Sequence, residues 1–400
     1  MPTSASDRSA TRAIALLAFA GFASQSMVRV TDSLLPQIAT DFNISVGAAA
    51  VAVWAYALAH GSVQLIIGPV GDRFGKYLCV TAAAAAATVL VALCGLAQSL
   101  PQLIIARLLV GFAAGWILPL GMAFLGDVIP YENRQRVLGR FLAGQVFGQL
   151  FGQAAGGVLG DLFGWRNVFF VLAGLFALAA FALVIEFARN PVTRASHALA
   201  TRSRGFITDY KTVLRSPWAR TVIVFAFLEN GCTFGAFAYV GAYLHLRFGL
   251  SLSFVGVLVG AFAIGGLIYS LTVGALIPRL GQTRFAAFGG LLLAVGFVTL
   301  ALTPYWQTTP LSVATVGFGF YMLHNTLQTN ITEAAPEARG TAVGIFSAMI
   351  YFGQMFFVSL GAWMFDRYGG EPVFIAAGLL LAMIGLVVAR TLLMRRRQSA

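Results

Sequence analysis

Two opposite charges stand in an otherwise apolar stretch near the start of the sequence, SQSMVRVTDSLLPQIATDF. A charge deep in a membrane helix costs roughly 2.5–3.5 kcal/mol on insertion scales, so such residues mark functional sites by default. Arg29 and Asp32 are spaced to share one helix face and to pair, and Gln25 extends that polar face by one turn.

A carboxylic acid beside a cavity suits proton coupling, because low dielectric favours its neutral form and a guanidinium favours the carboxylate. Asp32 is therefore predicted to be a coupling acid. Two alternatives stay open, a purely structural ion pair with Arg29 and a role in substrate binding alone.

Glu229, followed by Asn230, is the other acid placed well inside an apolar run, and Arg107 is the other arginine within a predicted span. Glu229 fits three roles: it binds a cationic substrate, serves as a second proton site, or pairs with Arg107 across a cavity. Arg107 is expected to tune one of the acids, with a structural role as the alternative.

Further polar and aromatic side chains recur at helical spacing and are predicted to line the cavity. They are Tyr56, His60, Gln64, Tyr321, His324, Asn325 and Gln328, with Trp116, Phe234 and Phe237 as an apolar wall. The alternative is that each polar residue forms an interhelical hydrogen bond, and that each histidine packs rather than titrates.

The composition requires a membrane. The chain has 400 residues, of which 59% are hydrophobic and 10% charged, against about 25% charged in soluble domains. Twelve apolar runs are long enough to cross about 30 Å of hydrocarbon. The predicted spans are 13–36, 46–70, 77–98, 101–126, 138–161, 167–188, 219–246, 252–277, 284–303, 310–332, 340–364 and 373–394.

The positive charges are sorted by side. With both termini inside, 21 of the 26 Lys and Arg fall in cytoplasmic segments, as the positive-inside rule requires. The net charge of +12 thus faces anionic lipid rather than nucleic acid. The location predicted is a bacterial-type inner (plasma) membrane, with the chain a monomer.

The sequence motifs do not indicate an enzyme. The three cysteines lie in apolar runs without metal or disulfide spacing. The sequence contains no Walker A motif or nucleophile triad, and its glycine runs lie inside spans. We therefore expect no enzyme, no cofactor and no metal, with small molecules, protons and lipids as partners.

The two halves repeat at an offset of about 205 residues. Gly148, Gln149, Gly156 and Asp161 of the fifth span recur in the eleventh as Gly353, Gln354, Gly361 and Asp366. Two parallel six-span repeats joined by a long basic loop are typical of a secondary transporter whose site lies between the halves.

These motifs resemble the major facilitator superfamily, and within it the twelve-span drug:proton antiporters. The loop GPVGDRFGK matches the family's gating motif at Gly68, Asp72, Arg73, Gly75 and Lys76. The fourth span carries the embedded Arg107. The fifth resembles the antiporter motif at Gly148, Gly152, Gly156 and Gly157, with Gln153 replacing its proline.

The resemblance implies an all-α membrane fold of two pseudo-symmetric six-helix bundles, at 1–188 and 219–400, with a cytoplasmic loop at 189–218. It implies that spans 1, 4, 7 and 10 line the cavity and that the Asp72 loop latches the inner gate. The function expected is proton-coupled export of small amphipathic, possibly cationic, molecules by rocker-switch alternating access. The alternative is an importer or permease for a metabolite or sugar, coupled to protons or uncoupled.

Overall fold

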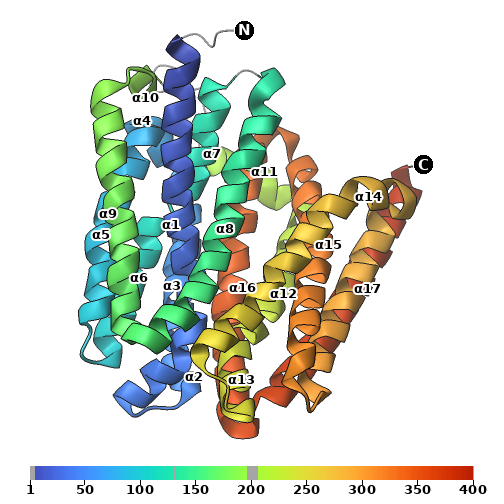
Figure 1. Ribbon diagram of the computed structural model, residues 1–400. Helices are drawn as coiled ribbons and strands as arrows, with labels where there is room; N and C mark the ends of the chain where they lie inside the picture. The colour runs from blue at the N-terminus through green and yellow to red at the C-terminus, as the bar shows by residue number, and fades with distance from the viewer. Residues whose placement is uncertain (1–4, 130, 196–205, 400) are drawn as a thin grey trace.

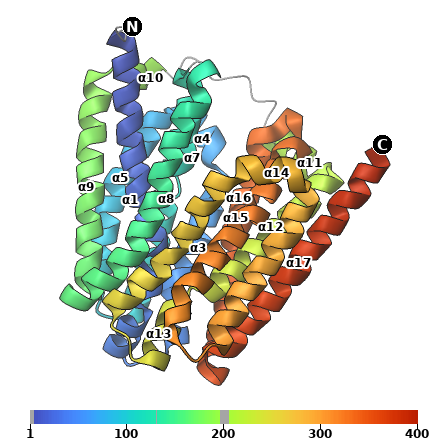
Figure 2. The same cartoon turned by 45° about the vertical axis from the view of Figure 1, so that its right-hand side comes forward.

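The computed structural model describes residues 5–129, 131–195 and 206–399, and in these ranges the chain is helical without strands. The helices form two groups that lean apart toward the end where both termini lie (Figure 1). The groups meet at the other end, near α2 and α13, also after a turn of the view (Figure 2). We call these the termini end and the opposite end.

The first group contains nine helices that form six membrane segments. They are α1 (Ala5–Phe42), α2 (Val46–Ala49), α3 (Val51–Gln64), α4 (Ile67–Phe74), α5 (Lys76–Leu96), α6 (Leu100–Ala114), α7 (Ile117–Val128), α8 (Tyr131–Phe163) and α9 (Trp165–Arg189).

Two short helices, α10 (Val192–Ala195) and α11 (Phe206–Arg215), follow between the groups, and residues 196–205 of the predicted 189–218 loop lie outside the described ranges. The second group is α12 (Pro217–Phe237), α13 (Val240–Phe248), α14 (Leu252–Leu302), α15 (Thr309–Ala334), α16 (Arg339–Tyr368) and α17 (Gly370–Ser399), with 3₁₀ turns at Trp306–Thr308 and Pro336–Ala338.

The predicted all-α fold with twelve membrane segments is confirmed. Nine helical stretches of the described chain are long and apolar enough to span a membrane. One of them, α14, has 51 residues and breaks at Gly281, whose φ of 69° is left-handed, so it supplies two spans. The helices α8 and α15, diluted by polar residues, supply the remaining two.

Several predicted spans differ in detail from the observed helices. The first span was expected to end at Pro36, but α1 continues to Phe42 with Pro36 inside it. Proline in that position leaves the carbonyl of Asp32 without its helical donor, an arrangement that membrane helices tolerate. The second span is broken twice, at Ala50 and at residues 65–66, and the fourth and seventh spans are each broken once, at residues 115–116 and 238–239.

Glycines of the fifth span hold α8 against α1. A Cβ atom on Gly148, Gly152 or Gly156 would collide with the backbone of Phe22, Ser26 or Val30, so these helices approach as closely as small residues permit. Gly157 faces the other group, where its neighbours are Leu252 and Gly256 of α14. The antiporter-type glycine motif thus serves two different interfaces.

The sequence repeat is visible as repeated contacts. Gln149 donates to Gln25 at 3.0 Å in the first group, and Gln354 donates to Asn230 at 2.7 Å in the second. These residues correspond at the repeat offset, so each amide pair fastens equivalent helices, α1 to α8 and α12 to α16.

Two ion pairs at the opposite end also correspond, with their charges exchanged. Arg166 pairs with Asp41 in the first group, and Arg247 pairs with Glu371 at 2.8 Å in the second. Arg166 also donates to the carbonyl of Ala97, and Arg247 to that of Ala301. Each pair binds the first and last segments of its own group together.

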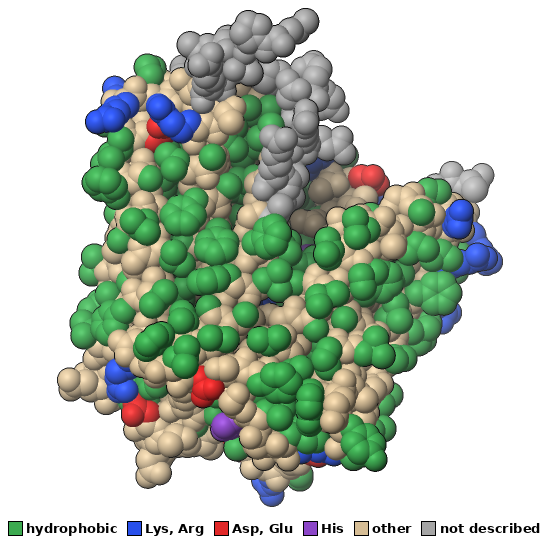
Figure 3. Space-filling model, viewed as in Figure 1, with side chains coloured by type: hydrophobic (Ala, Val, Ile, Leu, Met, Phe, Trp, Pro, Cys, Tyr) green, Lys and Arg blue, Asp and Glu red, His purple; other side chains and the backbone are tan. Residues whose placement is uncertain are grey.

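The surface matches a membrane position. Hydrophobic side chains cover the middle of the face in Figure 3, and charged ones gather toward its two ends. Between the two groups the surface is hollowed at the termini end (Figure 3).

Candidate functional site

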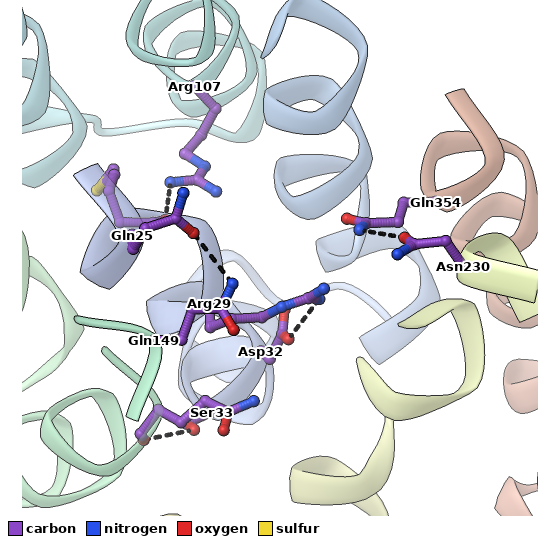
Figure 4. Close-up of polar contacts among 10 residues, drawn as sticks. Gln25, Arg29, Asp32, Ser33, Arg107, Gln149, Asn230 and Gln354 are labelled. Carbon is purple, nitrogen blue, oxygen red and sulfur yellow. Dashed lines mark hydrogen bonds and ion pairs between the residues drawn. The ribbon is translucent and has the colours of Figure 1, made fainter. Parts of the chain in front are cut away.

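The Arg29–Asp32 pair predicted from the sequence is present in the middle of α1. Arg29 Nη1 lies 3.4 Å from Asp32 Oδ2, and both residues are 3% exposed. Figure 4 shows the two side chains turned toward one another. Within the described chain, Asp32 Oδ1 and Arg29 Nε have no hydrogen-bond partner. A buried oxygen without a partner is uncommon, because buried polar groups are nearly always hydrogen-bonded.

Arg29 also reaches across to the second group. Its guanidinium carbon lies 3.7 Å from the centroid of the Phe234 ring, on α12. Tyr321 and Tyr351, also of the second group, lie within electrostatic range of it. A desolvated cation–π contact is worth about 2 kcal/mol, so Arg29 is held from both sides of the interface between the groups.

Arg107 is fully buried and fastens helices of the first group. It donates from Nε to the carbonyl of Ala52 at 2.9 Å and from Nη1 to that of Met27 at 3.4 Å. Its guanidinium lies 4.4 Å from the Tyr56 ring centroid and within electrostatic range of Asp32. Its hydrogen bonds to two backbone carbonyls agree with the structural alternative. Its proximity to Asp32 agrees with the predicted tuning role.

Glu229 meets a histidine rather than an arginine. Its Oε2 lies 3.2 Å from His324 Nδ1 on α15, while Arg107 bonds to carbonyls of its own group, so the suggested pairing of Glu229 with Arg107 is not what the structure shows. Glu229 is fully buried, and its Oε1 lacks a partner within the described chain. The His324 ring stacks on Phe320, with centroids 4.8 Å apart.

The predicted stripe on the second span is buried and lies against the second group. His60 Nδ1 is 3.2 Å from the Tyr56 hydroxyl, and the His60 ring lies 4.2 Å from that of Tyr351. Gln64 donates to the carbonyl of Gly115, where the fourth span breaks. Tyr351 was missed from the sequence, since nothing in the spacing of α16 marks it.

The stripe predicted on the tenth span divides between two environments. Tyr321 packs on Phe262, and His324 contacts Glu229. Asn325 instead forms a hydrogen bond with Tyr269 of α14, and Gln328 is exposed. Gln328 shares a helix face with His324 but lies one turn farther toward the termini end, where its side chain is exposed.

The predicted apolar wall is present in part. Phe234 and Phe237 pack with Phe262, at centroid distances of 5.7 and 5.0 Å. Trp116 instead makes an edge-to-face contact with Phe112, which is 47% exposed. Asn230, predicted to bind substrate, is engaged with Gln354 (Figure 4).

The predicted gating motif sits at the termini end of the first group. Gly75, with φ of 92°, makes the turn between α4 and α5, while Gly68 and Arg73 are exposed. Lys76 Nζ lies 3.3 Å from Asp72 and 2.6 Å from Asp127, at the end of α7. The expected latch pairing of Asp72 is therefore made inside its own group here. The part played by Asp127 was missed, because nothing in its local sequence brings it to Lys76.

Comparison with known proteins agrees with this architecture. The family model of the Major Facilitator Superfamily matches residues 17–353. The MFS-type transporter YceJ of Bacillus subtilis (strain 168) is 26% identical over 357 residues, 88% of this chain and 89% of that protein. Multidrug resistance protein 1 of the same organism is 25% identical over 361 residues, 88% of this chain and 90% of that protein.

Solved structures share the fold at low identity. A bacterial homolog of the human lysosomal transporter Spinster, inward-facing and unoccupied, has a TM-score of 0.75 at 17% identity and covers 98% of this chain and 99% of its own. The xylose transporter XylE from E. coli, in a partially occluded inward-open conformation, has a TM-score of 0.72 at 14% identity, with coverages of 95% and 97%.

Proposed function

Since the chain belongs to the Major Facilitator Superfamily, we propose that it is a proton-coupled antiporter that exports small amphipathic, cationic molecules. The observation that carries the proposal is the Arg29–Asp32 pair, buried in the middle of a membrane helix with one carboxylate oxygen unpartnered in the described chain. Similarity to a multidrug resistance protein supports export.

The coupling step follows from how Arg29 is shared. As a carboxylate, Asp32 attracts the guanidinium at 3.4 Å and competes with the Phe234 ring, which lies on the other group. Protonation of Asp32 removes that attraction and leaves Arg29 to the second group. A proton thereby changes the relative free energy of two arrangements of the groups, which is what a population shift requires.

The sidedness of the proposal rests on charge and on shape. By the positive-inside rule the termini end faces the cytoplasm of a bacterial inner membrane, and the hollow between the groups lies at that end (Figure 3). The structure then corresponds to the state that receives substrate from the cytoplasm, with the opposite end closed.

Glu229 is proposed to select cations, because it is a fully buried acid with one unpartnered oxygen in the described chain, and its partner His324 stacks on the Phe320 ring. We expect Glu229→Gln to weaken transport of the cation tetraphenylphosphonium by about tenfold, an effect of ~1.4 kcal/mol, and to change transport of neutral drugs far less. Concentration dependence of uptake into proteoliposomes measures this. Glu371→Gln, at the opposite end, is the control, and equal losses for both substrate classes would refute the role.

Phe234 is proposed to act through Arg29 as a positioning residue. Phe234→Leu keeps an apolar side chain but removes the ring face, so gradient-driven accumulation should fall by roughly threefold to tenfold. Exchange without a gradient should persist, and Phe234→Tyr should restore coupling. The control is Phe297→Leu, because Phe297 is a buried phenylalanine of the same group whose ring packs on Phe374, outside the site. A loss of exchange equal to the loss of accumulation would show that Phe234 merely shapes the binding site.

Antiport and symport are distinguished by the direction of the gradient that drives accumulation. Proteoliposomes with an acidic lumen should accumulate labelled tetraphenylphosphonium as protons leave, and those with an alkaline lumen should not. Accumulation under the alkaline-lumen gradient alone would identify the alternative, a proton-coupled importer. Substrate exchange whose rate depends on neither gradient would identify an uncoupled permease.

A further inference from the structure

Two aspartates that correspond in the sequence repeat take no part in the site described above. Asp161 lies in the last turn of α8 and Asp366 in the last turn of α16, 205 residues later. Both helices end at the opposite end of the molecule, where the two groups meet (Figure 2).

Asp366, from the second group, binds the first group. Its Oδ2 accepts a hydrogen bond from the Ser45 hydroxyl at 2.5 Å, and its Oδ1 accepts one from the Gly47 backbone N–H at 2.8 Å. Gly47 is the second residue of α2, which opens the second span. A Cβ atom at Gly47 would collide with the Asp366 carboxylate, so the absence of a side chain there makes room for the contact.

Asp161, from the first group, binds the second in the same manner. Its Oδ2 accepts a hydrogen bond from the Ser253 hydroxyl at 2.7 Å and one from the Ser253 backbone N–H at 3.2 Å. Ser253 is the second residue of α14, which opens the eighth span. Each carboxylate therefore accepts two hydrogen bonds from the other group. One comes from the backbone N–H of the second residue of a helix, and the other comes from a serine hydroxyl.

Both contacts use the same physics. The first backbone N–H groups of a helix have no partner inside it, and they carry the positive end of the helix dipole. A carboxylate placed there forms charge-assisted hydrogen bonds. Because one such bond set runs in each direction across the interface, separating the two groups at this end breaks both sets at once.

We infer that Asp161 and Asp366 form a two-fold latch, which holds the opposite end of the transporter closed while the termini end is open. The inference goes beyond the proposed function, since it requires alternating access but neither proton coupling nor a particular substrate. The two aspartates are positioning residues: they touch no substrate and act on the equilibrium between the two open states.

The test is a pair of spin labels read by pulsed electron resonance in lipid nanodiscs, without substrate or pH gradient. In a background with Cys79, Cys94 and Cys232 replaced by serine, labels are placed at the exposed residues Gln98 and Gln307, one on each group at the opposite end. A second pair, at Leu78 and Glu337, reports on the termini end.

Asp161→Ala and Asp366→Ala should each raise the long-distance population at the opposite end by about twofold or more. The double variant should show roughly the product of the two shifts, because the free energies of separate contacts add. The distance at the termini end should shorten in step. If an alanine variant does not fold, the asparagine variants, which lose the charge but keep an acceptor oxygen, are measured instead.

Matched controls are provided by the ion pairs inside each group. Asp41→Ala and Glu371→Ala remove the same charge at the same end, from pairs that do not cross the interface. These variants should leave both distance distributions as in the parent. An unchanged distribution in the double latch variant would overturn the inference. Equal widening in the controls, or widening without closure of the termini end, would overturn it too, because either would indicate general loosening.

Discussion

Replacing Asp32 by asparagine is expected to abolish proton-driven transport while leaving the protein folded and able to exchange substrate. Asparagine has almost the same shape as aspartate, so packing in α1 is retained, but it cannot bind and release a proton. Accumulation against a gradient should fall by about tenfold or more, to the level of protein-free liposomes. Uptake of labelled tetraphenylphosphonium into acid-lumen proteoliposomes measures the loss, and counterflow without a gradient measures what remains.

Asp41→Asn serves as the control for Asp32→Asn. Asp41 is an acid of the same helix, but it pairs with Arg166 at the opposite end, nine residues from Asp32. Its replacement should leave coupling intact. Full proton-driven accumulation by Asp32→Asn would return Arg29 and Asp32 to a structural ion pair.

The second large effect is expected on stability, from Gly152→Val in α8. A Cβ atom at this position would collide with the carbonyl of Ser26 on α1. Because the atoms that the valine would meet belong to the Ser26 backbone, the helices must separate, and overpacking of a tight interface costs about 1–3 kcal/mol. We expect a lower yield of monodisperse protein and a large drop in the melting temperature in detergent.

Gly174→Val is the matched control for this packing argument. Gly174 lies on α9 with no neighbouring atom within 4 Å of a built Cβ atom. The same substitution there should change the melting temperature little. A normal melting temperature for Gly152→Val would contradict the close contact between α1 and α8.

Much of the fold could be predicted because the membrane imposes simple rules on the sequence. Apolar run length sets the spans, and the turn between the eighth and ninth spans falls at Gly281 as expected from the break after 277. Gln149 recurs as Gln354 in the sequence repeat, and the two glutamines form equivalent amide hydrogen bonds, one in each group. The predicted end of the first span at Pro36 was wrong, because proline usually ends helices in soluble proteins but is tolerated inside a membrane helix.

The site could be predicted within single helices but not between them. Arg29 and Asp32 pair because their spacing alone places them on one face. The contacts of Arg29 with Phe234, of Glu229 with His324 and of His60 with Tyr351 join helices far apart in the sequence. Periodicity identifies the face of a helix that is polar, but it does not identify the neighbour that this face meets.

Antiport through Asp32 is tested most directly by measuring the lumenal pH of proteoliposomes with a preset acidic lumen. Lipophilic cations, neutral drugs and sugars are added in turn while a trapped dye reports the pH. Antiport through Asp32 predicts alkalinisation of the lumen that is triggered by the cations and lost in Asp32→Asn. No pH change with any class, alongside measurable counterflow of a sugar, would contradict it and identify an uncoupled permease.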